Sequence, residues 1–442
     1  MDDNLKLTPA EEAAKSFVLN LLLKGFQPSE RCDVSFTEDM YRLPDFYDDA
    51  KFKRGQKYFM DNRFGIMQSN LYGLFSLICE PNGAKLLDKT NHSSNATTAR
   101  KRYADTTFHM LSWCTDPLKP GSKSWESLKR VRLMHLAASN ASLQRTNRGI
   151  PQTFMTFTTF GFMGYALVKP HLLAIRHDCQ EDREAYVHLW AVIGSMLGIK
   201  DEYNMCLQKM EVVELICHIL IRYNFSLFLQ METRTFEKLG RAFIEGLKWY
   251  IPFSTYEARL FQARRLAGIP GYQYDVDVSK EFHLRQIFTK AELERIKVGF
   301  QNVKDFEYRR NLVFDENMYL IDIKRMSDSE TNNDHLDYNS NTYGTYKKLD
   351  TNQIDINDKK SVLMDLLDLK YPSELEITEV NDSNLSNYLN DRKFKELSKS
   401  DQMLVKISIH QLKVTNNFVL RPLIELTLSS MLSVMSVKET CC

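Results

Sequence analysis

Two helical stretches of this chain carry polar side chains where a core helix normally carries apolar ones. In the first, KRYADTTFHM, Arg102, Thr106 and His109 are spaced at i, i+4 and i+7 and therefore share one helical face. A guanidinium, a hydroxyl and an imidazole on one face need a partner that satisfies them. The pattern predicts such a partner, with simple pairing of Arg102, Asp105 and Thr106 on a helix surface as the alternative.

The second stretch, LKRVRLMHLAAS, places one histidine on an apolar stripe. His135 shares this stripe with Leu128, Val131 and Ala138. One imidazole among short and branched side chains suits a flat, metal-bearing ligand that needs clearance above the helix. The alternative is a core histidine bonded to a backbone carbonyl, which is the commoner role of a single histidine on such a face.

Length, charge and cysteine usage restrict the class of protein. The chain has 442 residues, of which 43% are hydrophobic, enough for one large domain or two ordinary ones. Its 58 Lys and Arg balance 57 Asp and Glu, which argues against nucleic-acid binding. The 8 cysteines are scattered without a C-x-x-C pair, so we expect reduced thiols in an intracellular compartment and no structural zinc site.

Three segments bear on whether the chain is secreted or contacts a membrane. The N-terminus, MDDNLKLTPAEEAAKSF, is acidic and lacks the apolar core of a signal peptide. The stretch VVELICHILIRYNFSLFLQ is interrupted by Glu214, His218 and Arg222, which favours a buried core helix. Residues 418–437 form a more continuous apolar helix, which can contact a membrane surface, cap the core or insert partly.

Helical periodicity dominates the chain, and β-type alternation is rare, so we predict an all-α protein. Residues 326–360 are rich in Asp, Asn, Ser and Thr and lack the apolar content to pack, which predicts a mobile linker. No nucleotide-binding glycine loop, G-x-S-x-G or H-E-x-x-H motif occurs. A polar loop is expected over residues 89–98, with N-cap candidates before a helix around Arg102 that ends before Pro117. Further helices are expected near residues 9–26, 52–80, 124–148, 151–165, 182–197, 202–230, 233–250 and 255–267.

Five segments, in order over about residues 43–270, resemble one known family. They read LPDFYDDAKFKRGQKYF, KRYADTTFH, PGSKSWESLKRVRLMH, GIPQTFMTFTTFGFMGYALV and EAYVHLWAVIGSMLGIKDEYN. The family contains the rubber oxygenases (latex-clearing proteins) and the endoplasmic-reticulum-bound mycophenolic-acid oxygenase mpaB, and the chain looks most like its uncharacterised animal members. The resemblance implies a globin-like multi-helix core of the rubber oxygenase type. The expected parts are an N-terminal helix and loop (1–42), the catalytic domain (43–325), the linker (326–360) and a C-terminal helical appendage (361–442).

The resemblance also implies a cofactor, haem b, and a way to hold it. A histidine in the segment matching RVRLMH binds the haem iron in the rubber oxygenases, which makes His135 the expected metal ligand. Haem propionates need cationic partners, for which Arg102, Arg130 and Arg132 are candidates. A solvated helix face is an equally good interpretation of Arg130 and Arg132.

The expected catalytic group is Arg102, Thr106, Asp105 and His109. Arg102 and Thr106 match polar residues near the haem, whereas Asp105 stands where the rubber oxygenases have a lysine above the iron. The position above the iron is therefore either open or partly filled by His109. Glu80 is a loose counterpart of the base proposed for those enzymes.

Two further departures bear on activity. Phe154 and Ala191 stand where animal members of the family often carry an acidic residue and an arginine. The leading hypothesis is a haem-dependent oxygenase that uses molecular oxygen on a hydrophobic, isoprenoid-like alkene, either in the cytoplasm or on the endoplasmic-reticulum membrane. The alternatives are an inactive haem- or lipid-binding protein on the same scaffold and a purely structural or interaction protein.

Overall fold

The computed structural model describes residues 6–32, 36–37, 41–146, 149–251, 253–301, 312–314, 320–322 and 392–415. Contacts divide the chain into two compact units, residues 1–306 with 387–442, and residues 307–386. The predicted linker, 326–360, and the predicted surface helix, 418–437, lie outside the described residues. The domain boundaries expected from the sequence stay predictions.

The described part of the first unit is built from helices, which confirms the all-α class. In the second unit, β1 (Leu312–Phe314) pairs antiparallel with β2 (Leu320–Asp322). The helices are α1 (Pro9–Leu23), α2 (Asp49–Asp61), α3 (Arg63–Cys79), α4 (Pro81–Lys89), α5 (Ala96–Thr115), α6 (Lys123–Thr146), α7 (Gln152–Val168), α8 (Gln180–Leu197), α9 (Met210–Leu220), α10 (Ser226–Met231), α11 (Arg234–Leu247), α12 (Tyr256–Leu266), α13 (Lys290–Gln301), α17 (Arg392–Glu396) and α18 (Lys399–Thr415). The short turns are η2 (Pro170–Leu172), η3 (Asp201–Tyr203), η4 (Met205–Leu207), the π-helical η5 (Ile221–Phe225) and η6 (Val278–Lys280).

Helix starts follow local capping signals in the sequence. Thr8 and Glu11 form a reciprocal capping box at the start of α1. Asn95 accepts a hydrogen bond from the backbone N–H of Thr98 and so begins α5. Because these bonds satisfy N–H groups that no helical carbonyl can reach, the residue types alone located the helix starts.

Two expected helices differ from the sequence-based bounds. The single helix expected near residues 52–80 is two helices, α2 and α3, which meet at Asn62. The side chain of Asn62 donates to the carbonyl of Tyr58 and accepts from the N–H of Arg176, 2.8 Å away. The helix expected from residue 202 begins only at Met210, because residues 201–207 form the turns η3 and η4.

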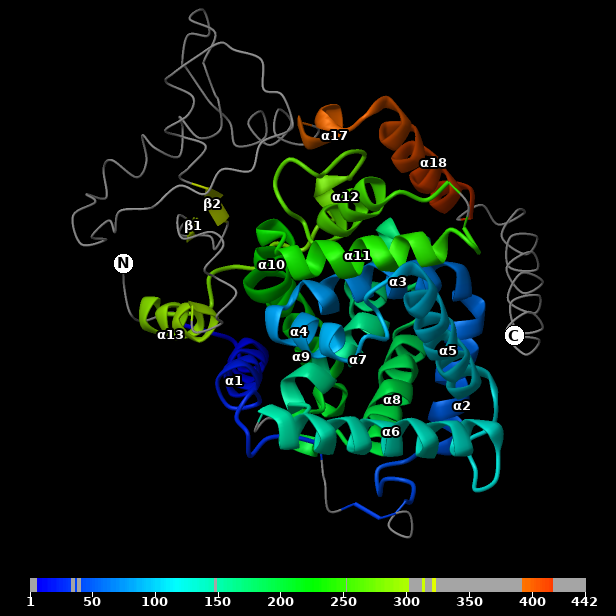
Figure 1. Ribbon diagram of the computed structural model, residues 1–442. Helices are drawn as coiled ribbons and strands as arrows, with labels where there is room; N and C mark the ends of the chain where they lie inside the picture. The colour runs from blue at the N-terminus through cyan, green and yellow to red at the C-terminus, as the bar shows by residue number, and fades with distance from the viewer. Residues whose placement is uncertain are drawn as a thin grey trace, which may run out of the picture. The chain divides into compact units, whose positions relative to one another are not determined.

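Helix α7 lies inside the bundle, where it contacts α3, α8 and α9 (Figure 1). The crossing with α3 is close because two glycines meet there. A Cβ placed on Gly73 would lie 1.9 Å from the carbonyl oxygen of Gly161. The absence of side chains therefore allows the two backbones to approach, and it buries nearly all of α7.

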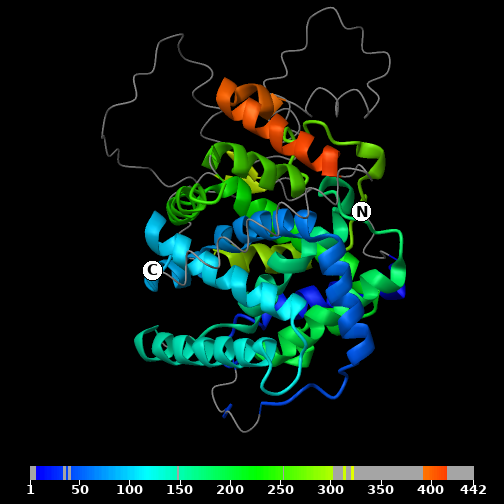
Figure 2. The same cartoon turned by 90° about the vertical axis from the view of Figure 1, so that its right-hand side faces the viewer.

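Helix α6 is the opposite case, a long helix at the edge of the bundle. It contacts α5 and α8, and in Figure 1 it runs across the lower end of α8. Figure 2 shows the same helix along the lower edge after a quarter turn. One face is exposed over most of its length, and the side chain of Met134 is 54% exposed.

The apolar stretch from Met210 to Met231 is a core element. By length and composition alone, this stretch is long and apolar enough to cross a membrane. However, 83% of its most apolar window is buried inside the protein. Its polar residues have protein partners: Glu214 pairs with Arg183, and the guanidinium of Arg222 donates to the carbonyl of Leu284. These contacts agree with the core helix that the interrupting charges predicted.

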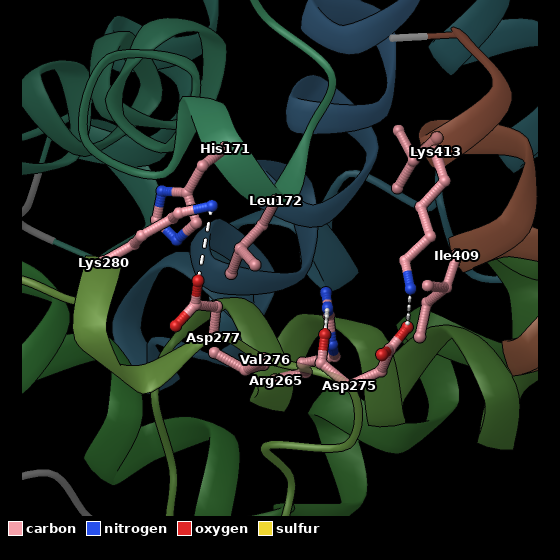
Figure 3. A pocket seen from close by; sticks show the side chains of 10 residues that line it. His171, Leu172, Arg265, Asp275, Val276, Asp277, Lys280, Ile409 and Lys413 are labelled. Atoms are coloured by element: carbon pink, nitrogen blue, oxygen red, sulfur yellow. Dashed lines mark hydrogen bonds and ion pairs between the residues drawn. The ribbon is translucent and has the colours of Figure 1, made fainter. Parts of the chain in front are cut away.

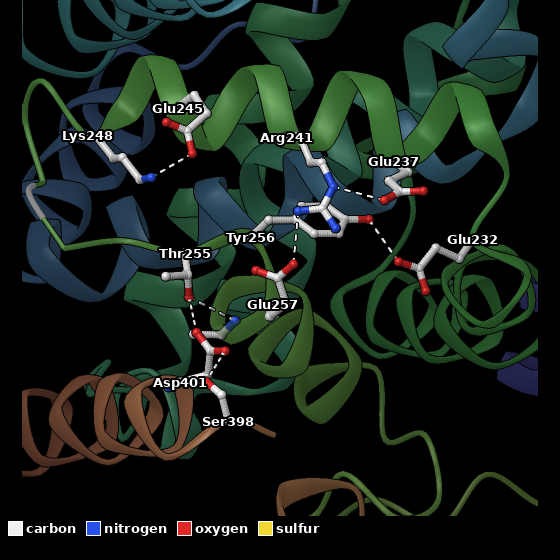
Figure 4. A network of polar contacts seen from close by, with 11 residues as sticks. Glu232, Glu237, Arg241, Glu245, Lys248, Thr255, Tyr256, Glu257, Ser398 and Asp401 are labelled. Carbon is white, nitrogen blue, oxygen red and sulfur yellow. Dashed lines mark hydrogen bonds and ion pairs between the residues drawn. The ribbon is translucent and has the colours of Figure 1, made fainter. Parts of the chain in front are cut away.

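Helices α17 and α18 pack on α12 within the first unit. The Thr255 hydroxyl caps α12 by accepting from Ala258 and donates to the carboxylate of Asp401, 2.6 Å away (Figure 4). Ser398, at the start of α18, donates to the other oxygen of Asp401. Beneath these polar contacts lies an apolar cluster of Ala258, Phe261, Phe394, Val405 and Ile409.

Candidate functional site

Helices α5 and α6 contact each other near His109. The His109 imidazole, through Nδ1, bonds the hydroxyl of Ser127, 2.7 Å away, and Trp113 donates to the same hydroxyl at 2.8 Å. Farther along the two helices, the positive charge of Arg102 on α5 acts on the imidazole of His135 on α6 and lowers its pKa.

His135 is a neutral imidazole with a buried nitrogen that has no partner. Among the described residues no hydrogen-bonding group reaches its Nδ1, which is sealed from solvent. Burial, followed by the positive charges of Arg102 and Arg132, lowers the pKa of His135 to about 4. Because the ring is neutral at pH 7 and a nitrogen is unengaged, it has the form that a transition metal binds.

Arg102 lies in the same contact with its charge uncompensated. Its guanidinium donates to the hydroxyl of Thr90, 3.1 Å away, and burial lowers its pKa. No carboxylate lies within ion-pair distance of Arg102 in the part of the chain that the structure describes. A buried guanidinium with only a hydroxyl for company favours an anionic ligand beside it.

The other two arginines of the prediction occupy different surroundings. Arg132 donates to the carbonyls of Ser195 and Met196, 3.1 and 3.2 Å away, at the end of α8. Its guanidinium also lies 3.9 Å from the centre of the Phe36 ring. Arg130 is exposed, as in the solvated helix face that was the alternative. Arg132 thus fastens α6 to α8, and a role toward haem propionates stays a prediction for both.

The remaining members of the predicted catalytic group are not gathered at His135. Thr106 donates to the backbone carbonyl of Arg102, 2.9 Å away within α5, and Asp105 is exposed. His109 lies toward the far end of the α5–α6 contact, and burial lowers its pKa. The charge of Arg102 acts on His135, and the catalytic roles of all four residues stay predictions.

Glu80 is engaged elsewhere. Its carboxylate accepts from the backbone N–H of Asn82 and of Gly83, 3.1 and 2.6 Å away, and so caps α4. Burial raises its pKa. This carboxylate stabilises the start of α4, and a role for Glu80 as a catalytic base stays a prediction.

The two departures from the family pattern lie in packed surroundings. The ring of Phe154 fills the space above Gly83, where an added Cβ would lie 2.1 Å from it. Ala191 is buried, and its backbone carbonyl accepts from the side chain of Asn204 at 2.9 Å.

Sequence reasoning missed two residues of this site. Thr90, the hydroxyl that holds Arg102, lies after α4 in a stretch that the sequence marked as a plain loop. Ser127, which joins His109 to Trp113, is an ordinary serine inside a helix. No local signal identifies either one, because their partners come from a different helix or from 12 residues away.

The residues between α5 and α6 fit a haem in two respects. His135 offers a neutral nitrogen donor, and Arg102 offers a buried cation without a carboxylate. The described residues contain no group of three or more His, Cys, Asp or Glu that could hold a bare metal ion. A haem iron, by contrast, needs as little as one protein ligand, since the porphyrin supplies four nitrogens.

Comparison with protein families places this region. Residues 56–209 match the family described as ER-bound oxygenase mpaB/B'/rubber oxygenase, catalytic domain. These residues include both α5 and α6. The match confirms, for this part of the chain, the family resemblance of the sequence motifs.

Other comparisons add little. No curated protein matches the chain. Among solved structures, the latex clearing protein LCP in the closed state is similar with a TM-score of 0.41 and 16% sequence identity, over 67% of this chain and 92% of that one. A likeness at this level carries no weight beside the family match.

Proposed function

We propose that the protein is a haem-dependent oxygenase in which His135 holds the iron of haem b. The observation that carries the proposal is the buried, unbonded Nδ1 of a neutral His135, within the residues that match an oxygenase family. Arg102 supports it, since a guanidinium without a carboxylate suits a haem propionate. When bound, haem b supplies the binding of molecular oxygen and the oxidising power for attack on a double bond.

The substrate that we propose is a hydrophobic, isoprenoid-like alkene. Leu128 and Val131 lie on the same stripe of α6 as His135 and give this stripe an apolar surface. Such a surface binds hydrocarbon and excludes water from the reacting groups. Arg102, Thr106, Asp105 and His109 are the residues that we propose to position the reactants, and the charge of Arg102 acts on His135.

One observation favours a second function. The two carboxylates considered for a base are otherwise placed: Glu80 caps α4, and the side chain of Asp105 is exposed. The alternative is therefore a haem- or lipid-binding protein that does not turn over an alkene. The two functions share His135 and differ only in oxygen consumption.

The experiment begins with the absorption spectrum of the full chain purified from haem-replete cells. We expect a strong Soret band that is lost in His135→Ala and kept in His109→Ala. His109 is the matched control, because it is a half-buried histidine at the same helix contact whose nitrogen is already bonded to Ser127. A Soret band of equal strength in His135→Ala would contradict the ligand assignment.

The haem-loaded protein then separates the two functions. Oxygen uptake should rise on addition of squalene, an isoprenoid alkene, and should stay at its basal rate with squalane, the saturated counterpart. Equal uptake with both compounds would exclude the alkene as the reacting group. A Soret band without any uptake across isoprenoid alkenes would favour the binding protein.

A further inference from the structure

A cavity of about 370 Å³ lies apart from the α5–α6 contact, and no residue of α5 or α6 lines it. It is bounded by η2, by the end of α12, by residues 275–280 and by the last turns of α18 (Figure 3). Its volume falls in the range of small-molecule sites. Most of its lining comes from outside residues 56–209, so the oxygenase family match does not account for it.

The floor of this cavity holds a buried arginine. Arg265 is only 4% exposed, and burial lowers its pKa. Its Nε donates to the carbonyl of Tyr274 at 2.8 Å and one terminal nitrogen donates to the carbonyl of Asp275 at 3.2 Å. The other terminal nitrogen has no acceptor among the described residues, and no described carboxylate lies within ion-pair distance of the guanidinium.

The two lysines around the cavity are different, because each has a carboxylate. These pairs are Lys413 with Asp275 at 2.6 Å and Lys280 with Asp277 at 3.3 Å. The His171 imidazole bonds the carboxylate of Glu281 at 2.9 Å. Glu281 also pairs with the buried Lys169. The charge of Arg265 is thus the one that the described lining leaves uncompensated, and a ligand with one negative charge would balance it.

The walls beside Arg265 are apolar. Leu172, Ile409 and Leu412 are 8%, 5% and 8% exposed and line the cavity together with Val276. The paired lysines lie at the rim, where Lys280 and Lys413 are 64% and 63% exposed. A buried cation among aliphatic side chains, below a neutralised rim, matches a ligand with one anionic head and a short hydrocarbon body.

We propose that this cavity binds a small organic monocarboxylate. The carboxylate accepts hydrogen bonds from the guanidinium of Arg265, and the hydrocarbon part lies on Leu172 and Leu412. A phosphate monoester suits the site less well, because its second charge would find no cation that lacks a carboxylate. The proposal is independent of haem and of the oxygenase activity.

The test measures binding of hexanoate to the full chain by isothermal titration calorimetry. Hexan-1-ol is the neutral probe of the same length, and hexyl phosphate is the dianionic one. We expect hexanoate to bind saturably and each of the other two at least about tenfold more weakly, since each loses the match to a single charge. Absence of saturable hexanoate binding, or equal binding of hexan-1-ol, would overturn the proposal.

A matched pair of variants at Val276 tests the site without removing Arg265, whose loss could loosen the loop that it holds. Val276→Glu adds a carboxylate to the lining, and Val276→Gln adds a neutral side chain of nearly the same shape. We expect Val276→Glu to weaken hexanoate binding about tenfold relative to Val276→Gln, because the added charge takes the place of the ligand's. Equal affinity in the two variants would place hexanoate elsewhere.

The same variants separate this proposal from the proposed function. The Soret band of haem-loaded Val276→Glu should equal that of the wild type, because Val276 lines the cavity around Arg265 and no residue of α5 or α6 lines that cavity. Loss of hexanoate binding with an unchanged Soret band would support the cavity alone. Loss of the Soret band in Val276→Glu would show that the two sites are coupled and would overturn their independence.

Discussion

Helices α6 and α7 follow each other in the chain but meet their surroundings in opposite ways. Nearly all of α7 is buried, and its polar side chains are bonded inside the protein: Thr153 donates to the carbonyl of Leu21, and the hydroxyl of Tyr165 bonds that of Ser76. Helix α6 is exposed along one face, and on its inner side Nδ1 of His135 is buried without a partner. Helix α7, which is buried with its polar side chains bonded, contributes to stability. Helix α6, which holds a buried nitrogen without a partner, carries the candidate site.

The difference teaches how to weigh aromatic and polar patterns. The phenylalanines of α7 can either form the core or wall a substrate pocket. Phe157 and Phe160 both contact the ring of Phe225, with ring centres 5.1 and 4.5 Å apart, and Phe162 stacks on Trp190. These contacts with other buried rings show that they fill the core.

The largest expected effect comes from opening a hole in the closed region. Phe160→Ala should lower the free energy of unfolding by about 3–5 kcal/mol, because the ring is fully buried against Tyr165 and Phe225. Met134→Ala on the exposed face of α6 is the comparison and should change it by less than about 0.5 kcal/mol. Urea unfolding measures both, and similar losses would refute the contrast between the helices.

A second test concerns the approach of α3 to α7. Gly73→Ala should destabilise the protein by about 1–3 kcal/mol, because its Cβ would meet the backbone of Gly161 and the helices would have to separate. Gly161→Ala is the matched control, since its Cβ would lie 3.3 Å from the nearest atom, which a small shift can relieve. Thermal unfolding should rank Gly73→Ala well below Gly161→Ala, and the reverse order would place the tight contact wrongly.

The smallest expected effect concerns how His218 makes the stability depend on pH. His218 on α9 stacks on Phe282, with ring centres 4.2 Å apart, and burial followed by the charge of Lys169 lowers its pKa to about 3, while Glu281 opposes the shift. Its unfolded form takes up a proton below about pH 6.5, whereas the folded form does not until about pH 3. The stability that it contributes is therefore complete above pH 6.5 and is lost as the pH falls toward 3.

On going from pH 7 to pH 5, the wild type should thus lose about 1–2 kcal/mol more than His218→Gln, measured by urea unfolding at both values. His92→Gln is the control, because the side chain of His92 is exposed and should leave the wild-type pH dependence unchanged. Parallel losses in the wild type and His218→Gln would mean that the imidazole is already hydrated in the folded state. His218→Gln should keep the Soret band, in contrast to His135→Ala.

Much of the fold followed from local signals. The caps at Thr8, Asn95 and Thr255 began helices where the sequence expected them, because each satisfies backbone N–H groups within its own turn. The division of one expected helix at Asn62 could not be foreseen. It depends on a bond to the backbone of Arg176, which is distant in sequence.

The candidate site was predictable to the same extent. The face shared by Arg102, Thr106 and His109 exists in any helix of that sequence, because it follows from a period of 3.6 residues. Which partners these residues meet depends on tertiary packing, which places Arg102 on Thr90 and His109 on Ser127. The cavity around Arg265 had no counterpart in the sequence analysis, since its lining comes from four separate segments.

The sequence by itself thus determined the all-α class, many of the helix starts, the resemblance to an oxygenase family and the histidine on an apolar stripe. Each of these rests on interactions within a few residues or on a pattern repeated along the chain. Only the tertiary structure decided which polar groups lack partners among the described residues, including Nδ1 of His135 and one terminal nitrogen of Arg265. The reason is physical: whether a buried group is satisfied depends on atoms that folding brings from elsewhere in the chain.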